Sequence, residues 1–241
     1  DLQKVVDAIY GNDPPDVIYI HYNRHYTHRI RNAASVNVPK IGFVGDPQDF
    51  IVDDEKHVLK RRWMRQAGIC AYMTIAPQAN WMVLKGLEDE SIPIINSHLA
   101  VDAEIFRDMH LRRPYDIGSF GAHTDSKYPF RILVRDYLIN QKEFSFNRKQ
   151  RVGRGGNDAA RFAKELNRFV SCFTCASIYG YTVAKYFEIP ACGTLLFGER
   201  TSLLEEFGYR DGVNFVEVSP ENFKEKFHYY LREAHPDDRR K

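Results

Sequence analysis

The sequence has no excess of charge of either sign and no long apolar run. Its 34 Lys and Arg residues against 32 Asp and Glu leave a formal net charge of +2, which excludes a protein that coats a polyanion through overall charge. No apolar run approaches the roughly 18 residues that a membrane-spanning helix needs. The hydrophobic share of 44% and the aromatic share of 13% exclude a disordered chain. We therefore expect a folded protein that neither spans a membrane nor binds nucleic acid.

Cysteine is scarce, and its spacing predicts no metal site. Cys172 and Cys175 form a C-x-x-C pattern, but the apolar segment 169–174 beside them is typical of a buried strand. A zinc site would need a second ligand pair at similar spacing, which the sequence does not contain. We therefore expect core cysteines and a reducing, cytoplasmic location. Residues 1–4 include no Met and no signal peptide, so we also expect a trimmed N-terminus.

Short apolar segments alternate with longer amphipathic segments along most of the chain. Strands are expected at residues 16–21, 40–44, 70–75, 92–95, 116–120, 143–146, 169–174, 194–197 and 214–218. Helices are expected at residues 27–35, 55–67, 78–88, 103–109, 129–139, 157–168, 181–189, 201–207 and 220–233. This alternation predicts an α/β protein with parallel, doubly wound sheets. A charged, irregular stretch near residues 98–114 predicts a boundary between two domains.

One candidate site follows the strand expected at 116–120. Gly121 lets a ligand approach the backbone, and a polar loop leads to a helix that begins near residue 129. Lys127 and Arg131 stand four residues apart around this helix start, where they could hold a diphosphate beside the helix N-terminus. The loop has neither a Walker A pattern nor G-x-G-x-x-G, so an ordinary strand-to-helix turn with solvated cations is the alternative.

A second candidate is the segment 177–197, which holds a glycine-containing loop, a short helix and an apolar strand. Glu188 lies between Phe187 and Ile189 near the end of the expected helix, so its carboxylate is expected to be half-buried. A buried carboxylate needs partners. It could accept hydrogen bonds from sugar or ribose hydroxyls, or it could pair with Lys185 or with a backbone group.

Residues 177–218 resemble the C-terminal half of glycosyltransferases with the GT-B fold. They look closest to glycosyltransferase family 4 and to the spore-maturation (CgeB-like) glycosyltransferases, which carry a glycine-containing loop, a helix ending in Glu and a Cys-Gly turn before a strand. Residues 38–47, 98–106 and 115–131 fit this resemblance as well. It implies two Rossmann-like, doubly wound domains that face a cleft. Residues 1–105 would form a short or truncated acceptor-side domain, and residues 106–241 the donor-binding domain.

The resemblance also implies roles for individual residues. Glu188 would bind the ribose of a nucleotide-sugar donor, and Lys127 and Arg131 would neutralise the departing diphosphate as catalytic cations. The remaining donor-binding positions would be Gly121, His123, Gly180, Tyr181, Thr182 and Gly193. Asp46 would be catalytic on the acceptor side, together with the acceptor-binding His21 and Asn23. Gly180 stands where the family-4 pattern has a second Glu, eight residues before Glu188.

These features predict a transferase that moves a sugar from a nucleotide sugar to an unknown glycan, lipid or protein acceptor. The donor half contains no D-x-D pair next to a strand, which favours a metal-independent, retaining enzyme without a cofactor. An inverting enzyme would need a base, for which Asp46, His21 and His123 are candidates. The alternatives are a non-catalytic GT-B-like module that binds a nucleotide or a sugar, and a nucleotide-sugar epimerase of the same fold.

Overall fold

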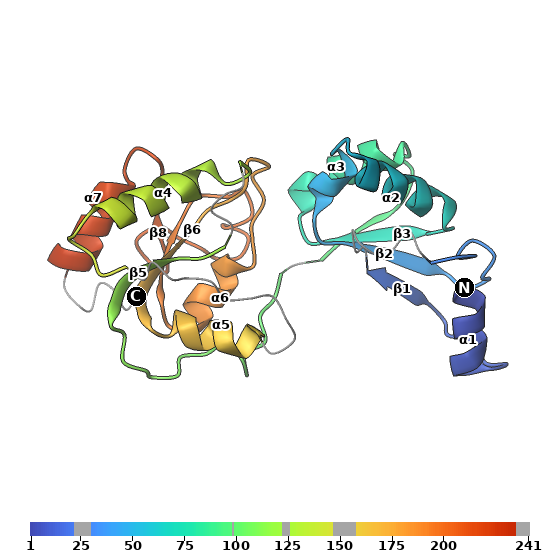
Figure 1. The fold of residues 1–241 in the computed structure, drawn as a ribbon, viewed down its shortest axis with the longest axis horizontal. Coiled ribbons are helices and arrows are strands. Elements are labelled where there is room, and N and C mark those ends of the chain that lie inside the picture. Colours follow the sequence, from blue (N-terminus) through green and yellow to red (C-terminus); the bar gives the residue numbers. More distant parts are fainter. Residues whose placement is uncertain (22–29, 98, 122–125, 147–157, 235–241) are drawn as a thin grey trace. The chain divides into compact units, whose positions relative to one another are not determined.

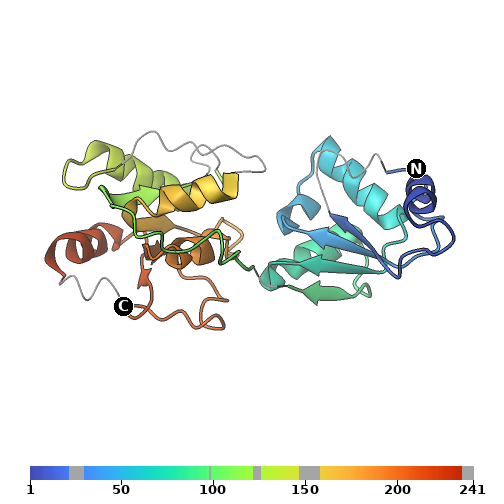
Figure 2. The same cartoon turned by 90° about the horizontal axis from the view of Figure 1, so that it is seen from below.

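The computed structural model describes residues 1–21, 30–97, 99–121, 126–146 and 158–234. The chain divides into two compact units, residues 1–98 (the N unit) and residues 99–241 (the C unit), each with its own sheet (Figures 1 and 2). This division lies ahead of the expected boundary at 105/106. Val101, Ile105 and Phe106 pack against the core of the C unit, so the connecting segment belongs to that unit.

The N unit is built around four parallel strands. Its strands are β1 (Ile18–His21), β2 (Lys40–Val44), β3 (Ala71–Thr74) and β4 (Ile94–Asn96), and they are neighbours in chain order. Its helices are α1 (Leu2–Tyr10), α2 (Glu55–Gln66) and α3 (Asn80–Leu87), with 3₁₀ turns η2 (Pro47–Phe50) and η3 (Pro77–Ala79) after β2 and β3. All four strands therefore end at the same edge of the sheet.

The two faces of the N-unit sheet differ in burial. Val44 and Tyr72 are buried against Met64 of α2 and Val83 of α3, and Figure 1 shows both helices over the same face. Side chains alternate between the faces of a strand, so the neighbouring residues point the other way. On that opposite face Tyr19 is 51% exposed. The helices α2 and α3 thus bury one face of the sheet.

The C unit contains a second parallel sheet. Its strands are β5 (Tyr115–Ser119), β6 (Phe169–Thr174), β7 (Leu195–Gly198) and β8 (Val216–Glu217), again neighbours in chain order. Phe146 forms a parallel bridge to Ile117 of β5, which pairs with β6 along its other edge. The chain therefore leaves β5 toward one side and returns to β6 on the other side. The strand order reverses between β5 and β6, which is a topological switch point.

Helices cover both faces of the C-unit sheet. α4 (Pro129–Asn140) and α7 (Phe223–His228, continued by a π-helical turn, η4, at Tyr229–Glu233) pack on Phe173 and Phe197. α5 (Asp158–Leu166) and α6 (Lys185–Ala191) pack on Cys172 and Leu196. Figure 1 shows α4 and α7 on one side of the sheet and α5 and α6 on the other. Adjacent strand residues point to opposite faces, so this unit is doubly wound, and the expected α/β class is confirmed.

Several expected helices are wrong or shifted. Within the expected helix 27–35, the described residues 30–35 form no helix: Asn32 adopts a left-handed conformation with φ of 56°, and residues 33–35 form a turn after it. Residues 103–109 and 201–207 form no helix either, and turns occupy residues 103–105 and 202–207. The expected helix 181–189 begins only at Lys185, since a loop occupies the preceding residues, and the last helix begins at Phe223. None of the helices in the described ranges has the length and apolar character that crossing a bilayer requires.

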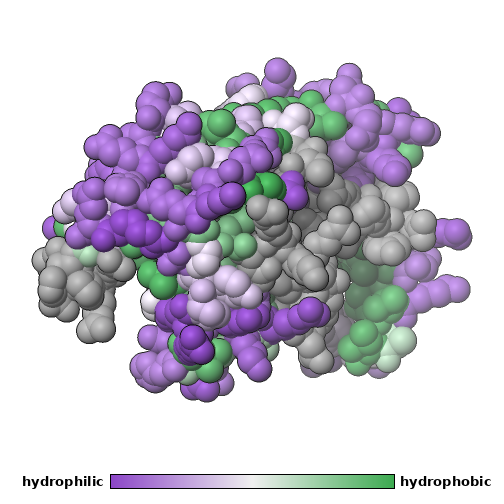
Figure 3. All heavy atoms as spheres, turned by 60° about the vertical axis from the view of Figure 1, so that its left-hand side comes forward, coloured by the Kyte–Doolittle hydropathy of each residue, from purple (hydrophilic) through white to green (hydrophobic). Residues whose placement is uncertain are grey.

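The surface of the described chain is mainly hydrophilic on the face shown in Figure 3. Burial separates the cysteines into two groups: Cys172, Cys175 and Cys192 are buried, and Cys70 is exposed. Burial raises the pKa values of Cys175 and Cys192 to about 11, so their reactive thiolates are rare near pH 7.

We expect iodoacetamide at pH 7.5 to label one cysteine of the native protein, Cys70, within the time in which denatured protein is labelled at all four. The thiol of Cys70 meets the reagent, whereas the three core thiols are shielded and protonated. Intact-protein mass spectrometry gives the number of labels, and Cys70→Ser is the matched control that should remain unlabelled. Rapid native labelling of a second cysteine would contradict the buried assignment.

Candidate functional site

The strand-order reversal places a candidate site at the carboxyl ends of β5 and β6. In open parallel sheets, ligands bind beyond these ends at the switch point. The chain leaves β5 through Phe120 and Gly121, and it leaves β6 through Cys175 and Ala176. The two loops are joined, because the Ile178 N–H donates to the Lys127 carbonyl at 2.9 Å. His123 lies outside the described residues, as does the rest of 122–125.

Arg131 brings a positive charge to the end of β5. It lies in the first turn of α4, is only 2% exposed, and stacks its guanidinium over the Tyr128 ring at 4.0 Å from the ring centroid. A Cβ atom built on Gly121 would lie 2.7 Å from Arg131 Nη1, and the Gly121 φ of +109° is one that other residues rarely adopt. Gly121 therefore gives the Arg131 guanidinium direct access to the backbone at the strand end, where the sequence predicts the approach of a ligand.

Lys185 adds a second cation at the same place. It is the first residue of α6, and its Cε lies 3.4 Å from the Cβ position built on Gly121. From the sequence, Lys185 was a possible partner for Glu188 and was not among the predicted site residues. A lysine at a helix start after a glycine-containing loop was the available signal, but only the fold brings residues 121, 131 and 185 together. Lys127 is half-buried and lies two residues before α4, in the loop that joins β5 to that helix.

Glu188 is the carboxylate of α6 and lies one turn after Lys185. It is half-buried, and this burial raises the pKa of its carboxyl group, an effect that the charge of Lys185 partly offsets. No hydrogen bond reaches this carboxylate from the residues that the structure describes. A half-buried carboxylate with unused acceptor capacity is suited to bind ligand hydroxyl groups.

The loop from β6 to α6 lies at this edge as well. Gly180 has a φ of +74°, its N–H donates to the Ser177 carbonyl at 2.8 Å, and a Cβ atom built on it would point into open space. Tyr181 and Thr182 are buried, so the loop presents backbone rather than these two side chains. The Thr182 and Thr201 hydroxyl oxygens lie 2.6 Å apart and join this loop to the segment after β7.

A carboxylate that sequence reasoning missed stands next to this loop. Glu199 directly follows β7, and its Oε2 accepts a hydrogen bond from the Ala176 N–H at 3.0 Å. Burial raises the pKa of Glu199, and the bond from Ala176 lowers it in part. A charged residue directly after a buried strand was the signal that could have indicated it.

The structure does not bring Gly193 to this edge. Gly193 follows α6 and precedes the amino end of β7, and amino ends of parallel strands lie opposite the carboxyl ends. Its φ is +64°, and a Cβ there would lie 2.8 Å from Asp108 Oδ2. Gly193 is therefore required for the turn that ends α6 and for close packing against the connecting segment.

Two predicted acceptor-side residues lie at the carboxyl edge of the N-unit sheet. His21 ends β1, is exposed, and its ring centroid is 5.2 Å from that of Phe43. Asp46 follows β2, is exposed, and its Oδ1 accepts a hydrogen bond from Gln48 Nε2 at 3.3 Å. Because both strands are parallel, the two side chains share one edge of the N unit. Asn23 lies outside the described residues.

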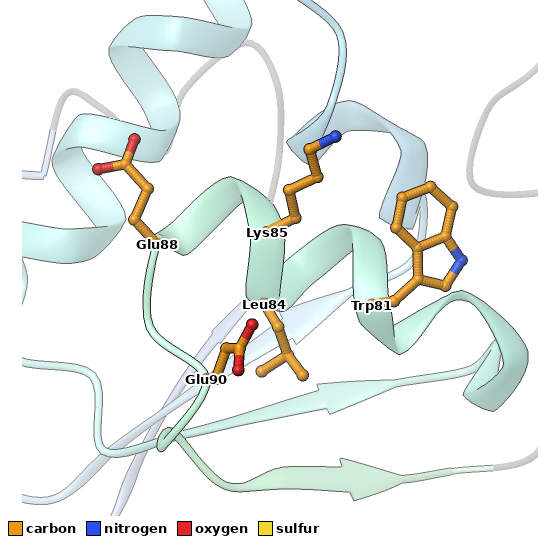
Figure 4. A pocket seen from close by; sticks show the side chains of 5 residues that line it. All are labelled: Trp81, Leu84, Lys85, Glu88 and Glu90. Carbon is orange, nitrogen blue, oxygen red and sulfur yellow. The ribbon is translucent and has the colours of Figure 1, made fainter.

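A surface hollow of about 650 Å³ lies on α3 of the N unit. Figure 4 shows Trp81, Lys85 and Glu88 pointing away from the helix on one side, with Leu84 and Glu90 close together on another. The Glu88 carboxylate is already paired with Arg65 at 2.5 Å. These side chains do not converge on one point, so the hollow is a weaker candidate than the switch point of the C unit.

Residues 123–241 match the family model of glycosyl transferase-like domains. The match covers the C unit from the loop after β5, which carries the candidate site. The matched residues thus include Arg131, Lys185, Glu188 and Glu199 of the candidate site, whereas β5 and Gly121 precede the match. No curated protein matches the chain by sequence.

Solved structures match the chain in fold. Sucrose-phosphate synthase from Thermosynechococcus elongatus is 14% identical with a TM-score of 0.62, over 99% of this chain and 68% of that chain. TarM is 11% identical with a TM-score of 0.57, over 90% of this chain and 47% of that chain. Accessory secretory protein 1,2 and 3 in Streptococcus pneumoniae is 8% identical with a TM-score of 0.50, over 99% and 50%.

These matches establish the GT-B architecture, because two parallel-sheet units in series match glycosyltransferases of that fold. The chain spans about two thirds of the first of these proteins and about half of the other two. Together with the glycosyltransferase-like domain, this architecture supports a glycosyltransferase.

Proposed function

We propose that the protein transfers a sugar from a nucleotide-diphosphate sugar to an acceptor hydroxyl, as a glycosyltransferase of the family-4 or spore-maturation type. The observation that carries this proposal is the meeting of Arg131, Lys185 and Glu188 at the switch point of the glycosyltransferase-like domain. Cations suit a diphosphate, and an unused carboxylate suits the hydroxyl groups of a ribose. Both chemistries are needed to hold a nucleotide sugar.

In this proposal, the cations act on the leaving group. When the bond between the anomeric carbon and the phosphate oxygen breaks, negative charge builds on the diphosphate. Arg131, Lys185 and Lys127 would stabilise this charge, together with backbone N–H groups around Tyr181 and Thr182. Because side-chain cations and backbone amides can stabilise this negative charge, we retain the prediction of a metal-independent enzyme without a cofactor.

The transfer step balances without a protein base. The acceptor oxygen forms a bond to the anomeric carbon on the face that the diphosphate leaves, so the configuration is retained. The acceptor proton passes to the departing phosphate oxygen, and the products are the glycoside and the nucleoside diphosphate. In an inverting enzyme, Asp46, His21 or His123 would take this proton instead.

The acceptor half of the proposal rests on the N unit. Exposed His21 and Asp46 stand together at the carboxyl edge of its sheet, where polar groups can bind an acceptor hydroxyl. Asn23 would join them. The acceptor could be a glycan, a lipid or a protein, since a hydroxyl group is all that the step requires.

We expect one of uridine, guanosine or thymidine diphosphate to raise the unfolding temperature of the protein. A ligand at about 100 times its dissociation constant stabilises by about 2.7 kcal/mol, which for a protein of this size shifts the unfolding temperature by about 5–10 °C. Differential scanning fluorimetry measures the shift. Lys185→Ala should reduce it strongly, and Lys164→Ala, an exposed lysine on α5, is the matched control.

Zero shift with all three diphosphates in a folded sample would contradict nucleotide binding. Incubation with the sugar donor in the absence of acceptor, followed by chromatography of the products, then distinguishes the three possible activities. Released sugar indicates a transferase acting on water, a changed sugar indicates an epimerase, and no product indicates a module that only binds.

A further inference from the structure

Glu199 occupies a position at the switch-point edge that the proposed function leaves unused. Thr174 of β6 and Gly198 of β7 are paired in register, so the next residues, Cys175 and Glu199, leave the sheet side by side. The ring of Tyr186 packs on Gly198, where an added Cβ would lie 2.9 Å from Cε1. The Tyr186 hydroxyl donates to the Glu199 carbonyl at 2.5 Å. The backbone of Glu199 is therefore held in place at the edge.

One oxygen of the Glu199 carboxylate is held and the other is available. Oε2 accepts the Ala176 N–H at 3.0 Å. For Oε1, the described part of the chain supplies no hydrogen bond, and this atom is not among the buried polar atoms that lack a partner. Oε1 therefore meets solvent at the edge where the ligand is expected.

The negative charge of the Glu199 carboxylate is not neutralised by an ion pair with any described residue. Within the described ranges no Lys, Arg or His side chain forms an ion pair with its carboxylate. The nearby Cys175 thiol and Tyr186 hydroxyl stay uncharged at neutral pH, because burial raises the pKa of both groups. The charges of Arg131 and Glu199 both act on these two groups, so the cation and the carboxylate flank the same spot.

The segment that carries Glu199 is joined to its neighbours by ion pairs and a hydrogen bond. Arg200 pairs with Glu205 at 2.8 Å and with Glu217 at 2.6 Å, and the Thr201 hydroxyl lies 2.6 Å from that of Thr182. Such fixed neighbours keep a binding group in one geometry, which is what selective recognition requires.

We propose that Glu199 binds hydroxyl groups of the donor's sugar and thereby selects that sugar. This inference rests on the proposed function. In a nucleotide sugar, the diphosphate joins the ribose to the sugar that is transferred, and Glu188 is assigned to the ribose. Glu199 is the second carboxylate of this edge, one strand farther from β5, and it is assigned to the transferred sugar. Vicinal hydroxyl groups of a hexose donate well to a carboxylate oxygen in a partly dry site.

Two variants distinguish binding of the donor's sugar by Glu199 from its support of the loop after β6. Glu199→Gln can still accept the Ala176 N–H through its amide oxygen, but it presents an NH₂ group in place of Oε1. Glu199→Ala loses both contacts. Calorimetric titration of each variant with uridine, guanosine and thymidine diphosphate, and with their glucose or mannose conjugates, gives the affinity ratio between sugar conjugate and bare diphosphate.

We expect Glu199→Gln to bind the bare diphosphate within about twofold of the unmodified protein, and the sugar conjugate about tenfold more weakly. Glu199→Ala should weaken both ligands, because the loop after β6 also loses its contact. Glu206→Gln, an exposed glutamate of the same unit, is the matched control and should change neither. Unfolding temperatures without ligand confirm that each variant is folded.

The outcomes distinguish the two proposals. If the unmodified protein binds none of the diphosphates, the proposed function fails. If it binds them but Glu199→Gln keeps the original affinity ratio, the role of Glu199 is overturned and the proposed function stands. The role is also overturned if no sugar conjugate binds more tightly to the unmodified protein than its bare diphosphate does.

Discussion

Glu188→Gln will lower the affinity for the preferred nucleoside diphosphate about a hundredfold. The Glu188 carboxylate is half-buried and receives no hydrogen bond from the described residues, so ligand hydroxyl groups would be its partners. Each charge-assisted hydrogen bond contributes about 1.5–3 kcal/mol, and two of them at the lower end account for about 3 kcal/mol, or two orders of magnitude in affinity. Isothermal titration calorimetry measures the change.

The pH dependence of ligand binding is a second test of the role of Glu188. Because the pKa of Glu188 is raised above 4.5, the carboxylate is lost at a higher pH than for an ordinary glutamate. Its contribution to binding is therefore full at neutral pH and falls as the pH falls through that raised pKa. The ligand phosphate titrates too, so the relevant quantity is the difference between the unmodified protein and Glu188→Gln. A difference that stays constant down to pH 4.5 would count against this role.

Arg113→Met will destabilise the C unit by about 3–5 kcal/mol. The guanidinium is mostly buried, and its Nη1 donates to the Phe169 carbonyl and to Thr194 Oγ1, both at 2.7 Å. Its Nη2 donates to the Cys192 carbonyl at 2.8 Å and pairs with Asp108 at 3.2 Å. The variant leaves these acceptors without their donor, and each unsatisfied group costs about 1–3 kcal/mol.

Calorimetric unfolding measures this loss, which should lower the transition temperature of the C unit by about 10 °C. Arg112→Met is the matched control, because Arg112 is the exposed neighbour and should change stability by less than about 0.5 kcal/mol. Arg113→Lys should recover only part of the loss, since an ammonium group cannot reproduce the fork of the guanidinium. Equal effects of the changes at positions 112 and 113 would show that the hydrogen bonds around Arg113 do not carry the stability.

Local patterns in the sequence predicted most strands, because a buried strand is a short apolar run that needs no knowledge of its neighbours. The strands expected at 40–44 and 169–174 are β2 and β6 with the same bounds. The helix expected at 201–207 is wrong, although its composition suits a helix. There the chain turns at Gly208, whose φ is +77°, and the Tyr209 hydroxyl contacts the Tyr186 carbonyl at 2.5 Å. A contact with a distant helix decided the local conformation.

The candidate site was predictable in part for the same reason. Gly121 and Arg131 lie in one strand–loop–helix unit, so the sequence placed both at the same strand end. Lys185 and Glu199 come from two later units, and they reach this edge only because β6 pairs with β5 and β7 pairs with β6. Gly193 shows the converse, since a residue close to Glu188 in sequence lies at the opposite end of the sheet.

The sequence by itself determined the α/β class, a boundary region near residues 98–114 and the half-buried state of Glu188, because periodicity and flanking residues encode these locally. The tertiary structure decided that Phe146 and β6 flank β5 on opposite sides, which creates the switch point. It also decided which charges meet there. Strand order is a property of long-range pairing, whose free energy depends on residues far apart in the chain, and no local pattern specifies it.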